Sequence, residues 1–361
     1  MARETERDEG GFGRGFLTDA WYFAAMAREV RRGRLMRLEM LGQPVLLGRS
    51  PDGALVALHD VCPHRAAPLS AGRFAREADG RASVECPYHG WRFRADGRCV
   101  AVPSLVNGQD LDVSRIRVAR YPVAESQGMI FVFMPADRRA EAEPPPPPRF
   151  PDIADDAPHI VERRTFAAHI DHAIVGLMDP AHGPYVHQQW WWRSRRSAHE
   201  KAKAFAPSLE GFVMLRHSPS SNSRAYAALG GAPQTEITFR LPALRWEHVT
   251  VGKRQVLALT CLTPETDRST RIVQIIWSDH PVFGLAGPLV AIAARRFLEQ
   301  DGRMIDLQNE GLRYDPSLIW IDDADRQARW YQALKREWLA SHREARGFVN
   351  PVQPAMLRWT S

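Results

Sequence analysis

Short apolar runs separated by turn residues dominate the first third of the chain. Each run has about the length of a β-strand, and the breaks carry glycine, proline or aspartate, as at Ser50-Pro51-Asp52-Gly53. The runs are Ala20 to Ala25, Leu35 to Leu41, Pro44 to Gly48, Ala54 to Leu58, Arg117 to Pro122 and Met129 to Met134. This pattern predicts an all-β domain over residues 17 to 135.

A proline-rich stretch separates this region from the rest of the chain. Residues 136 to 149 begin with charged side chains and end with five consecutive prolines, Pro144 to Pro148, and an arginine. Proline has no backbone N–H and favours the extended polyproline II conformation, so such a run does not pair in a sheet. We expect a linker or a surface excursion here.

The hydrophobic pattern changes again over residues 150 to 361, which we take as the second domain. A strand is expected at 159 to 166 and a helix at 167 to 179. Five more strand-like runs are followed by two segments of helical length: 212–217, 234–241, 246–251, 255–263 and 270–278, then 285–311 and 323–345. Strands followed by long helices favour an α+β domain in which an antiparallel sheet wraps against a helix.

Length and composition suit an ordinary globular protein of two domains, because 361 residues are enough for two separate cores.

Residues 1 to 16 are charged and glycine-rich without the apolar centre of a secretory signal, so we expect a mobile arm. The most apolar segment, 281 to 297, is broken by Gly284, Gly287 and Pro288 and is too short for a membrane span. We therefore expect a cytoplasmic protein.

The net charge of +6 is modest, and the basic residues are scattered rather than clustered. No nucleic-acid-binding motif accompanies them, so nucleic acid is not an expected partner. Two of the four cysteines, Cys99 and Cys261, have no candidate ligands near them in sequence and are expected to be free thiols.

Cysteine and histidine alternate in two short motifs, Cys62-Pro63-His64 and Cys86-Pro87-Tyr88-His89, with 21 residues between them. Such mixed pairs are typical of metal sites. A Rieske [2Fe–2S] cluster holds one iron with two cysteines and the other with two histidines, so each loop would supply one ligand to each iron. A structural Cys2His2 zinc site uses the same residue types, but zinc fingers usually pair like with like within a loop.

A second group of candidate ligands follows the expected helix of the second domain. The run from Asp179 to His187 reads D-x-x-H-x4-H, with histidines at His182 and His187. Two histidines and a carboxylate form the facial triad that binds ferrous iron and leaves coordination positions open. A five-residue step does not return to the same face of a regular helix, so Gly183-Pro184 should break the helix and let the rings converge. Taken alone, the pattern also fits a helix end with surface histidines.

The two motifs together resemble a known family. The loops around Cys62 and Cys86 resemble those of Rieske proteins, and Asp179 to His187 resembles the mononuclear-iron motif of Rieske non-haem iron oxygenases. The resemblance covers Trp21 to about Gln308 and is closest to terminal oxygenase (alpha) subunits of the vanillate O-demethylase and dicamba demethylase kind. It implies an all-β Rieske domain followed by a helix-grip-like sheet domain with long C-terminal helices.

The resemblance also implies ligand sets for both metal centres. Cys62, His64, Cys86 and His89 would hold the [2Fe–2S] cluster, and His182 and His187 would bind a mononuclear Fe(II). The family's third iron ligand is an aspartate on the long C-terminal helix, which implies Asp301, with Glu299 and Asp306 as alternatives.

A catalytic role for Asp179 follows from the same resemblance. In the family this aspartate joins a histidine of the iron site to a Rieske histidine of a neighbouring subunit, which would link His182 to His89 in a homotrimer. Some relatives carry an asparagine three residues before this aspartate, where this chain has Gly176. Asp171 or His172 are candidates to replace its hydrogen bond.

The implied function is that of a terminal oxygenase component. O2 and electrons from NAD(P)H, delivered by a separate reductase or ferredoxin, would hydroxylate or oxidatively demethylate a small aromatic or alicyclic substrate. Monooxygenation is favoured over ring cis-dihydroxylation, and a Rieske electron-transfer protein without oxygenase activity is the alternative from another class. Trp190 to Trp192 and the apolar segment 283 to 292 could line the pocket or serve packing instead.

Overall fold

The chain forms two compact units, Thr18–Asp155 and a larger one of Met1–Leu17 with Asp156–Ser361. The structure is a computed structural model that describes residues 11–138, 143–151, 157–187, 195–220, 226, 229–314 and 316–361. In this described part, no helix combines the length and the hydropathy of a bilayer-spanning segment.

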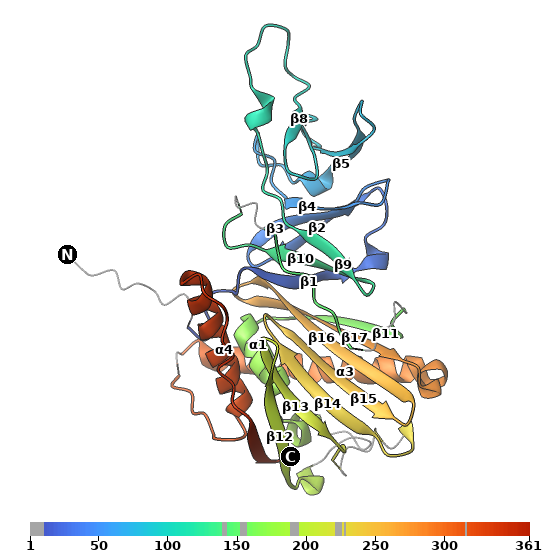
Figure 1. Cartoon of the computed structure of the whole chain (residues 1–361), viewed down its shortest axis with the longest axis vertical. Coiled ribbons are helices and arrows are strands. Elements are labelled where there is room, and N and C mark those ends of the chain that lie inside the picture. Colours follow the sequence, from blue (N-terminus) through green and yellow to red (C-terminus); the bar gives the residue numbers. More distant parts are fainter. Residues whose placement is uncertain are drawn as a thin grey trace, which may run out of the picture. The chain divides into compact units, whose positions relative to one another are not determined.

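The smaller unit consists of three small antiparallel sheets (Figure 1). Their strand orders are β1-β10-β9, β2-β3-β4 and β5-β6-β7-β8. The strands are β1 (Ala20–Met26), β2 (Arg34–Met40), β3 (Gln43–Arg49), β4 (Leu55–His59), β5 (Arg73–Arg76), β6 (Ala82–Glu85), β7 (Arg92–Phe93), β8 (Cys99–Ala101), β9 (Val123–Ser126) and β10 (Met129–Met134). The all-β character expected from the apolar runs is therefore confirmed.

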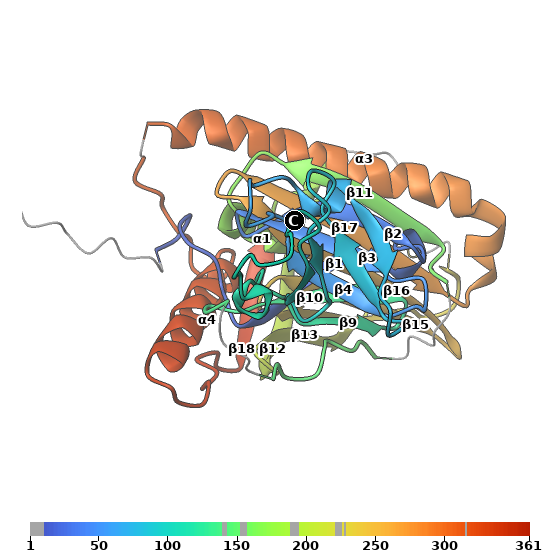
Figure 2. The same ribbon diagram turned by 90° about the horizontal axis from the view of Figure 1, so that it is seen from above.

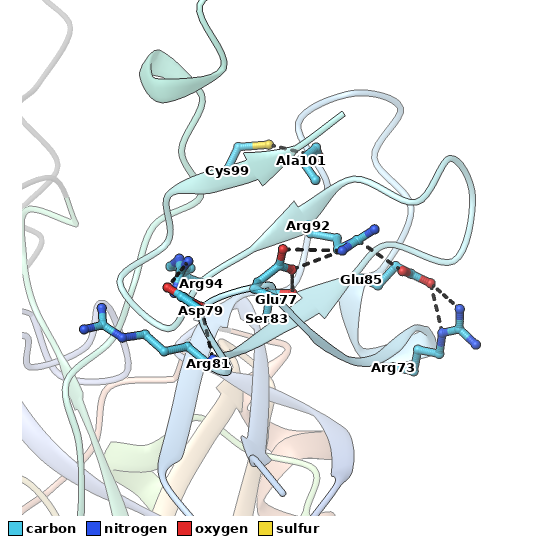
Figure 3. A network of polar contacts seen from close by, with 10 residues as sticks. All are labelled: Arg73, Glu77, Asp79, Arg81, Ser83, Glu85, Arg92, Arg94, Cys99 and Ala101. Atoms are coloured by element: carbon cyan, nitrogen blue, oxygen red, sulfur yellow. Dashed lines mark hydrogen bonds and ion pairs between the residues drawn. The ribbon is translucent and has the colours of Figure 1, made fainter. Parts of the chain in front are cut away.

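The hairpin of β5 and β6 is fastened to its neighbours by charged side chains (Figure 3). Arg92 on β7 forms ion pairs with Glu77 at 3.3 Å and with Glu85 at 3.4 Å. Arg94 pairs with Asp79 in the β5–β6 turn at 2.8 Å. The hairpin leads directly into Cys86, so these pairs hold the base of the second cysteine-histidine loop.

One expected strand of this unit is wrong. Arg117 to Pro122 forms only isolated bridges, because its backbone changes partners along its length. Val118 N bonds to Gly97 O, whereas Tyr121 N bonds to Ala57 O in β4. The segment thus passes from one sheet to another before a ladder can form. Strands β5 to β9 were not expected, since runs of two to four residues are too short to show a period.

The described part of the proline-rich stretch runs along the smaller unit. Trp21 Nε1 donates to the carbonyl of Pro145 at 2.7 Å. The amide side chain of Gln127 exchanges two hydrogen bonds with the backbone of Phe150, at 2.8 and 3.1 Å. The backbone of Pro145 and of Phe150 is therefore held by side chains of this unit.

The larger unit is organised around one eight-stranded antiparallel sheet (Figure 1). Its strand order is β11-β17-β16-β15-β14-β13-β12-β18, so β12 to β17 are neighbours in chain order. The strands are β11 (Ile160–Phe166), β12 (Glu200–Ser208), β13 (Gly211–His217), β14 (Gln234–Arg240), β15 (Leu244–Val251), β16 (Arg254–Thr266), β17 (Ser269–Ser278) and β18 (Ala355–Thr360).

In the part of this unit that the structure describes, four α-helices accompany the sheet: α1 (Ile170–Met178), α2 (Gly183–Val186), α3 (Pro281–Leu312) and α4 (Arg326–Arg343). Helix α3 extends along one face of the sheet (Figure 2), with Leu298 and Ile305 buried two turns apart. Trp330 of α4 packs its ring 5.3 Å from that of Phe212 on β13. The α+β architecture, with a helix-grip-like sheet domain and long C-terminal helices, is confirmed.

Residues 11 to 17 belong to the larger unit, where they pack beside α1 and α4. The carboxylate of Asp171 on α1 is fully buried and accepts from the backbone N–H of Gly13 at 2.7 Å. Lys335 and Tyr331 of α4 donate to the same carboxylate, each at 2.6 Å. One buried acid therefore joins the N-terminal segment to two helices.

Candidate metal centres

The first cysteine-histidine loop follows β4 and closes on itself. The N–H of Cys62 donates to the carbonyl of Ala67, and the N–H of Ala66 donates back to the carbonyl of Cys62, both at 2.9 Å. Asp60, which precedes the loop, is buried and accepts two bonds from Ser70, which follows it, at 2.6 and 2.5 Å. These contacts fix the loop that presents Cys62 and His64.

The second loop follows β6 and has the same closed form. The N–H of Cys86 donates to the carbonyl of Trp91 at 2.8 Å, and the N–H of Gly90 donates to the carbonyl of Cys86 at 3.1 Å. Gly90 has a φ of +71°, and a Cβ there would lie 3.2 Å from Pro103 Cγ. The glycine is therefore required by the turn that positions His89.

The two loops lie against each other, so that histidine lies beside histidine and cysteine beside cysteine. The rings of His64 and His89 are 4.5 Å apart, and Trp91 stacks on His64 at 4.7 Å. Both cysteines are 2% exposed, whereas both histidines are partly exposed. Burial raises the pKa of the Cys62 thiol to about 11, and the Cys86 thiol beside it adds to the rise.

This donor set suits a group with two metal ions. With its pKa raised, the Cys62 thiol stays protonated unless a metal cation stabilises its thiolate. His64 Nδ1 is buried without a hydrogen-bond partner and is therefore free to serve as a metal ligand. Within the described residues, these four side chains do not form a set whose ligand atoms all lie within 4.8 Å of one another. The four ligand atoms of a single zinc ion lie 2.0 to about 2.3 Å from the metal and are therefore all within 4.8 Å of one another.

The second candidate centre begins where α1 ends. After Met178 the chain makes one short turn, α2, with His182 at its N-cap and His187 at its C-cap. Gly183 and Pro184 occupy the first two positions of this turn. The break lets the two imidazoles converge, with His182 Nε2 and His187 Nε2 3.1 Å apart.

Asp301 on α3 completes a set of three ligand atoms. Its Oδ1 lies 3.1 Å from His187 Nε2 and 3.6 Å from His182 Nε2. Among the described residues, this is the one group of three or more His, Cys, Asp or Glu side chains whose ligand atoms all lie within 4.8 Å. The alternatives Glu299 and Asp306 are exposed and do not join it.

The close approach of α3 to β11 depends on the residue after Asp301. A Cβ at Gly302 would lie 2.5 Å from Arg164 Nε and 3.2 Å from Phe166 Cε1, both on β11. A side chain at this position would require the side chains of Arg164 and Phe166 to shift. Glycine at 302 therefore helps to hold Asp301 at the histidines.

Further contacts orient the two imidazoles. His187 Nδ1 lies 3.0 Å from Gln300 Oε1, and the ring of Phe297 is 4.3 Å away. Asp179 Oδ2 lies 3.6 Å from His182 Nδ1, an ion-pair rather than a hydrogen-bond separation. Burial lowers the pKa of His182, but the carboxylates of Asp179 and Asp301 outweigh it, so that the pKa lies above its usual value. Sequence reasoning missed Gln300, because only its position before Asp301 hinted at a role.

The two residues considered as replacements for an asparagine at Gly176 are engaged elsewhere. Asp171 is bound to α4 and the N-terminal segment, and His172 packs edge-on against Phe12 at 4.8 Å. A Cβ at Gly176 would meet only Ile305 Cδ1 at 3.4 Å. The space at Gly176 is part of a cavity of about 440 Å³ that also touches Asp179 and His182.

A second cavity, of about 390 Å³, also touches the three candidate ligands. It lies between the sheet and α3 and is lined by both histidines and by Asp301. Val290, within the apolar segment 283 to 292, and Phe297 contribute to its apolar wall. The tryptophans at 190 to 192 lie outside the described residues.

Two family models match the chain in succession. Residues 20–122 match the Rieske [2Fe-2S] domain, and residues 166–339 match the vanillate O-demethylase oxygenase C-terminal domain. The first spans the two cysteine-histidine loops, and the second spans all three candidate ligands of the other centre.

Relatives and solved structures agree with these matches. The chain is 36% identical over 177 residues to the oxygenase component of dicamba O-demethylase from Stenotrophomonas maltophilia, covering 48% of each protein. It is 32% identical over 183 residues to the chloroplast protein TIC 55 of Arabidopsis thaliana, covering 50% of this chain and 32% of that protein. The matched part is thus half or less of these relatives. The crystal structure of dicamba monooxygenase bound to dicamba has the same fold, with a TM-score of 0.70, 23% identity, and coverage of 90% of this chain and 99% of that one.

Proposed function

Because the chain belongs to the Rieske oxygenases, we propose that it is the terminal component of a monooxygenase that hydroxylates or demethylates a small aromatic or alicyclic molecule. The observation that carries the proposal is the convergence of His182, His187 and Asp301 at the wall of a cavity. A pure electron-transfer protein has no need of such a site. The cavity volume lies within the usual range for small-molecule sites.

Both centres offer donors that fit the metals of this family. We propose that Cys62, His64, Cys86 and His89 hold the [2Fe–2S] cluster, and that His182, His187 and Asp301 hold Fe(II). When bound, the cluster supplies single electrons and the mononuclear iron supplies open positions for O2. Two imidazoles and one carboxylate are the donor set that ferrous iron takes in such sites.

At the proposed iron site, the residues around the ligands orient the imidazoles and restrict the access of water. Gln300 Oε1 accepts from His187 Nδ1–H, which leaves the Nε2 lone pair for the metal. The Phe297 ring covers one side of the same imidazole. Asp179 Oδ2 lies 3.6 Å from His182 Nδ1, where its negative charge favours the tautomer of His182 that carries its proton on Nδ1.

A homotrimer and electron transfer between subunits form a second part of the proposal. The side chain of Asp179 is 33% exposed, so it can accept a second N–H, that of His89 of the partner subunit. Leu318 and Ile319, which line the cavity beside Asp179, are 42% and 89% exposed. Such exposed apolar side chains are the kind that a neighbouring subunit covers.

The proposed electron donor is a ferredoxin or an NAD(P)H-dependent reductase. The histidine side of the cysteine-histidine loops faces solvent, where Tyr88 is 60% exposed and Arg65 is also exposed. A net charge of +6 favours the approach of an acidic donor. NAD(P)H supply suits a reducing cytoplasm, as do four cysteines that form no disulfide in the described structure.

Oxygen uptake tests the proposal directly. With a reductase, NADH and a screen of aromatic ethers and acids, the protein should consume O2 in proportion to product, with one atom of ¹⁸O from ¹⁸O2 in the product or in released formaldehyde. His182→Ala should abolish turnover and keep the visible spectrum of the cluster.

The exposed His199 of the same unit provides a matched control, and His199→Ala should turn over normally. If His182→Ala retains substrate-dependent O2 uptake, the histidine does not hold the reactive metal. Electron transfer that never consumes O2 with any substrate would instead favour the electron-transfer alternative.

A further inference from the structure

The cavity beside the candidate iron site has a polar wall on its sheet side. Arg245 of β15, Thr260 of β16 and Gln274 of β17 all line it. In the strand register Arg245 is opposite Thr260, and Thr260 is opposite Gln274. Directly opposed residues on one face of a sheet lie close enough to act together, so the three side chains form one row of polar groups.

Two members of this row lack partners within the protein. Gln274 Oε1 is buried and has no hydrogen-bond partner. The half-buried guanidinium of Arg245 makes no hydrogen bond or ion pair with any residue in the described part of the chain. Its strand neighbour Glu247 forms no ion pair with it, and that carboxylate accepts instead from Tyr226 and from Thr235 Oγ1 at 2.9 Å.

The other cations on the cavity wall have partners. Lys203 Nζ donates to the carbonyl of Ser218 at 3.1 Å, and the buried Lys201 Nζ donates to Ser361 Oγ at 2.9 Å. The opposite wall, from α3, carries small and apolar side chains such as Ala294 and Phe297. The cavity thus joins an apolar surface and the candidate iron ligands to a guanidinium that has no hydrogen-bond or ion-pair partner in the described part of the chain.

We propose that Arg245 binds an oxyanion group, carboxylate or sulfonate, of an aromatic substrate, and that the hydroxyl of Thr260 donates a hydrogen bond beside it. The inference rests on the proposed function and narrows its substrates to aromatic acids. A guanidinium presents parallel N–H groups that match the two oxygens of such an anion. The ring of the acid would pack on the apolar wall from α3, and the anion at Arg245 would orient the molecule toward the iron ligands.

Ligand binding to the iron-loaded protein tests this proposal without turnover. Calorimetric titrations compare benzoate and benzenesulfonate with benzamide, a neutral molecule of the same shape as benzoate. The wild type should bind at least one of the anions about tenfold or more tightly than benzamide, because hydrogen bonds to charged groups are the stronger ones. Arg245→Gln should bring the three dissociation constants to within about twofold, and Arg245→Lys should keep part of the preference.

Arg216→Gln is the matched control, because Arg216 is exposed on β13 of the same sheet and does not line the cavity. It should retain the wild-type preference for anions. The relative affinities of benzoate and benzenesulfonate show which oxyanion the site accepts. An equal affinity of the wild type for all three ligands would overturn the inference, as would an undiminished anion preference in Arg245→Gln. Neither result concerns O2 uptake, so this inference and the proposed function can fail separately.

Discussion

The two ring nitrogens of His187 have different neighbours, and these neighbours determine which nitrogen is available to bind a metal. Nε2 faces Asp301 and His182, whereas Nδ1 faces the amide oxygen of Gln300. An acceptor at Nδ1 keeps the proton there and leaves Nε2 as the metal-binding nitrogen. Gln300 and Asp301 are consecutive on α3, so one turn of helix supplies both a proposed ligand and the residue that orients another.

We predict that Gln300→Leu weakens iron binding at this site. Loss of an orienting partner of a metal-bound histidine typically costs about 10- to 100-fold in metal affinity. Chelator competition for Fe(II) measures the change, and the visible spectrum of the cluster should stay as in the wild type. Gln332→Leu on α4 serves as the control for the same substitution. Unchanged Fe(II) affinity in Gln300→Leu would show that the contact has no orienting role.

Among the individual site residues, the sequence predicted those that belong to short, local motifs. The two cysteine-histidine loops and the pair His182 and His187 are each short in sequence, so their spacing alone indicated metal sites. Asp301 required the family resemblance, because any long helix carries several acids. Arg245 and Gln274 could not be found from sequence, since the strand register alone brings them to one wall.

Helix α1 presents Asp179 at its C-terminal end, and its position depends on a buried charge near its start. Asp171 is fully buried and bonded to Lys335, Tyr331 and the backbone of Gly13. A buried ion pair adds little net stability, but removal of one partner leaves the other charge uncompensated. This network therefore joins α1, α4 and residues 11 to 17 into one block.

We predict that Lys335→Met destabilises the larger unit by on the order of 3 kcal/mol, because the Asp171 carboxylate stays buried without its cation. Urea denaturation of the full-length protein measures the loss. Arg336→Met, at the exposed neighbouring position, should have little effect. The double variant Lys335→Met with Asp171→Asn should recover much of the stability. A midpoint for Lys335→Met equal to that of the wild type would contradict the prediction.

Long, regular elements were predictable from sequence, and short or edge elements were not. The expected helices at 285–311 and 323–345 correspond to α3 (Pro281–Leu312) and α4 (Arg326–Arg343), because each carries several turns of helical spacing. Strand β12 was missed because alanine, lysine and a proline give it a weak strand signal. It is ordered by pairing with β18 at the far end of the chain.

The whole molecule divides its proposed chemistry between two units. The smaller one holds the cysteine-histidine loops, with the cysteines inside and the histidines toward solvent. The larger one holds the cavity and the candidate iron ligands. The order of the domains and the kind of centre in each were predictable from motifs and their resemblance. The extent of the cavity and its charged wall were not predictable, because they depend on contacts between strands that are distant in sequence.

The iron content per chain decides whether the protein holds a mononuclear iron beside the cluster. We predict three irons and two acid-labile sulfides in the wild type, and two irons with two sulfides in Asp301→Ala. Asp306→Ala, which changes an exposed acid on the same helix, should keep three irons. Two irons in the wild type, or three in Asp301→Ala, would contradict the assignment of a mononuclear iron site to His182, His187 and Asp301.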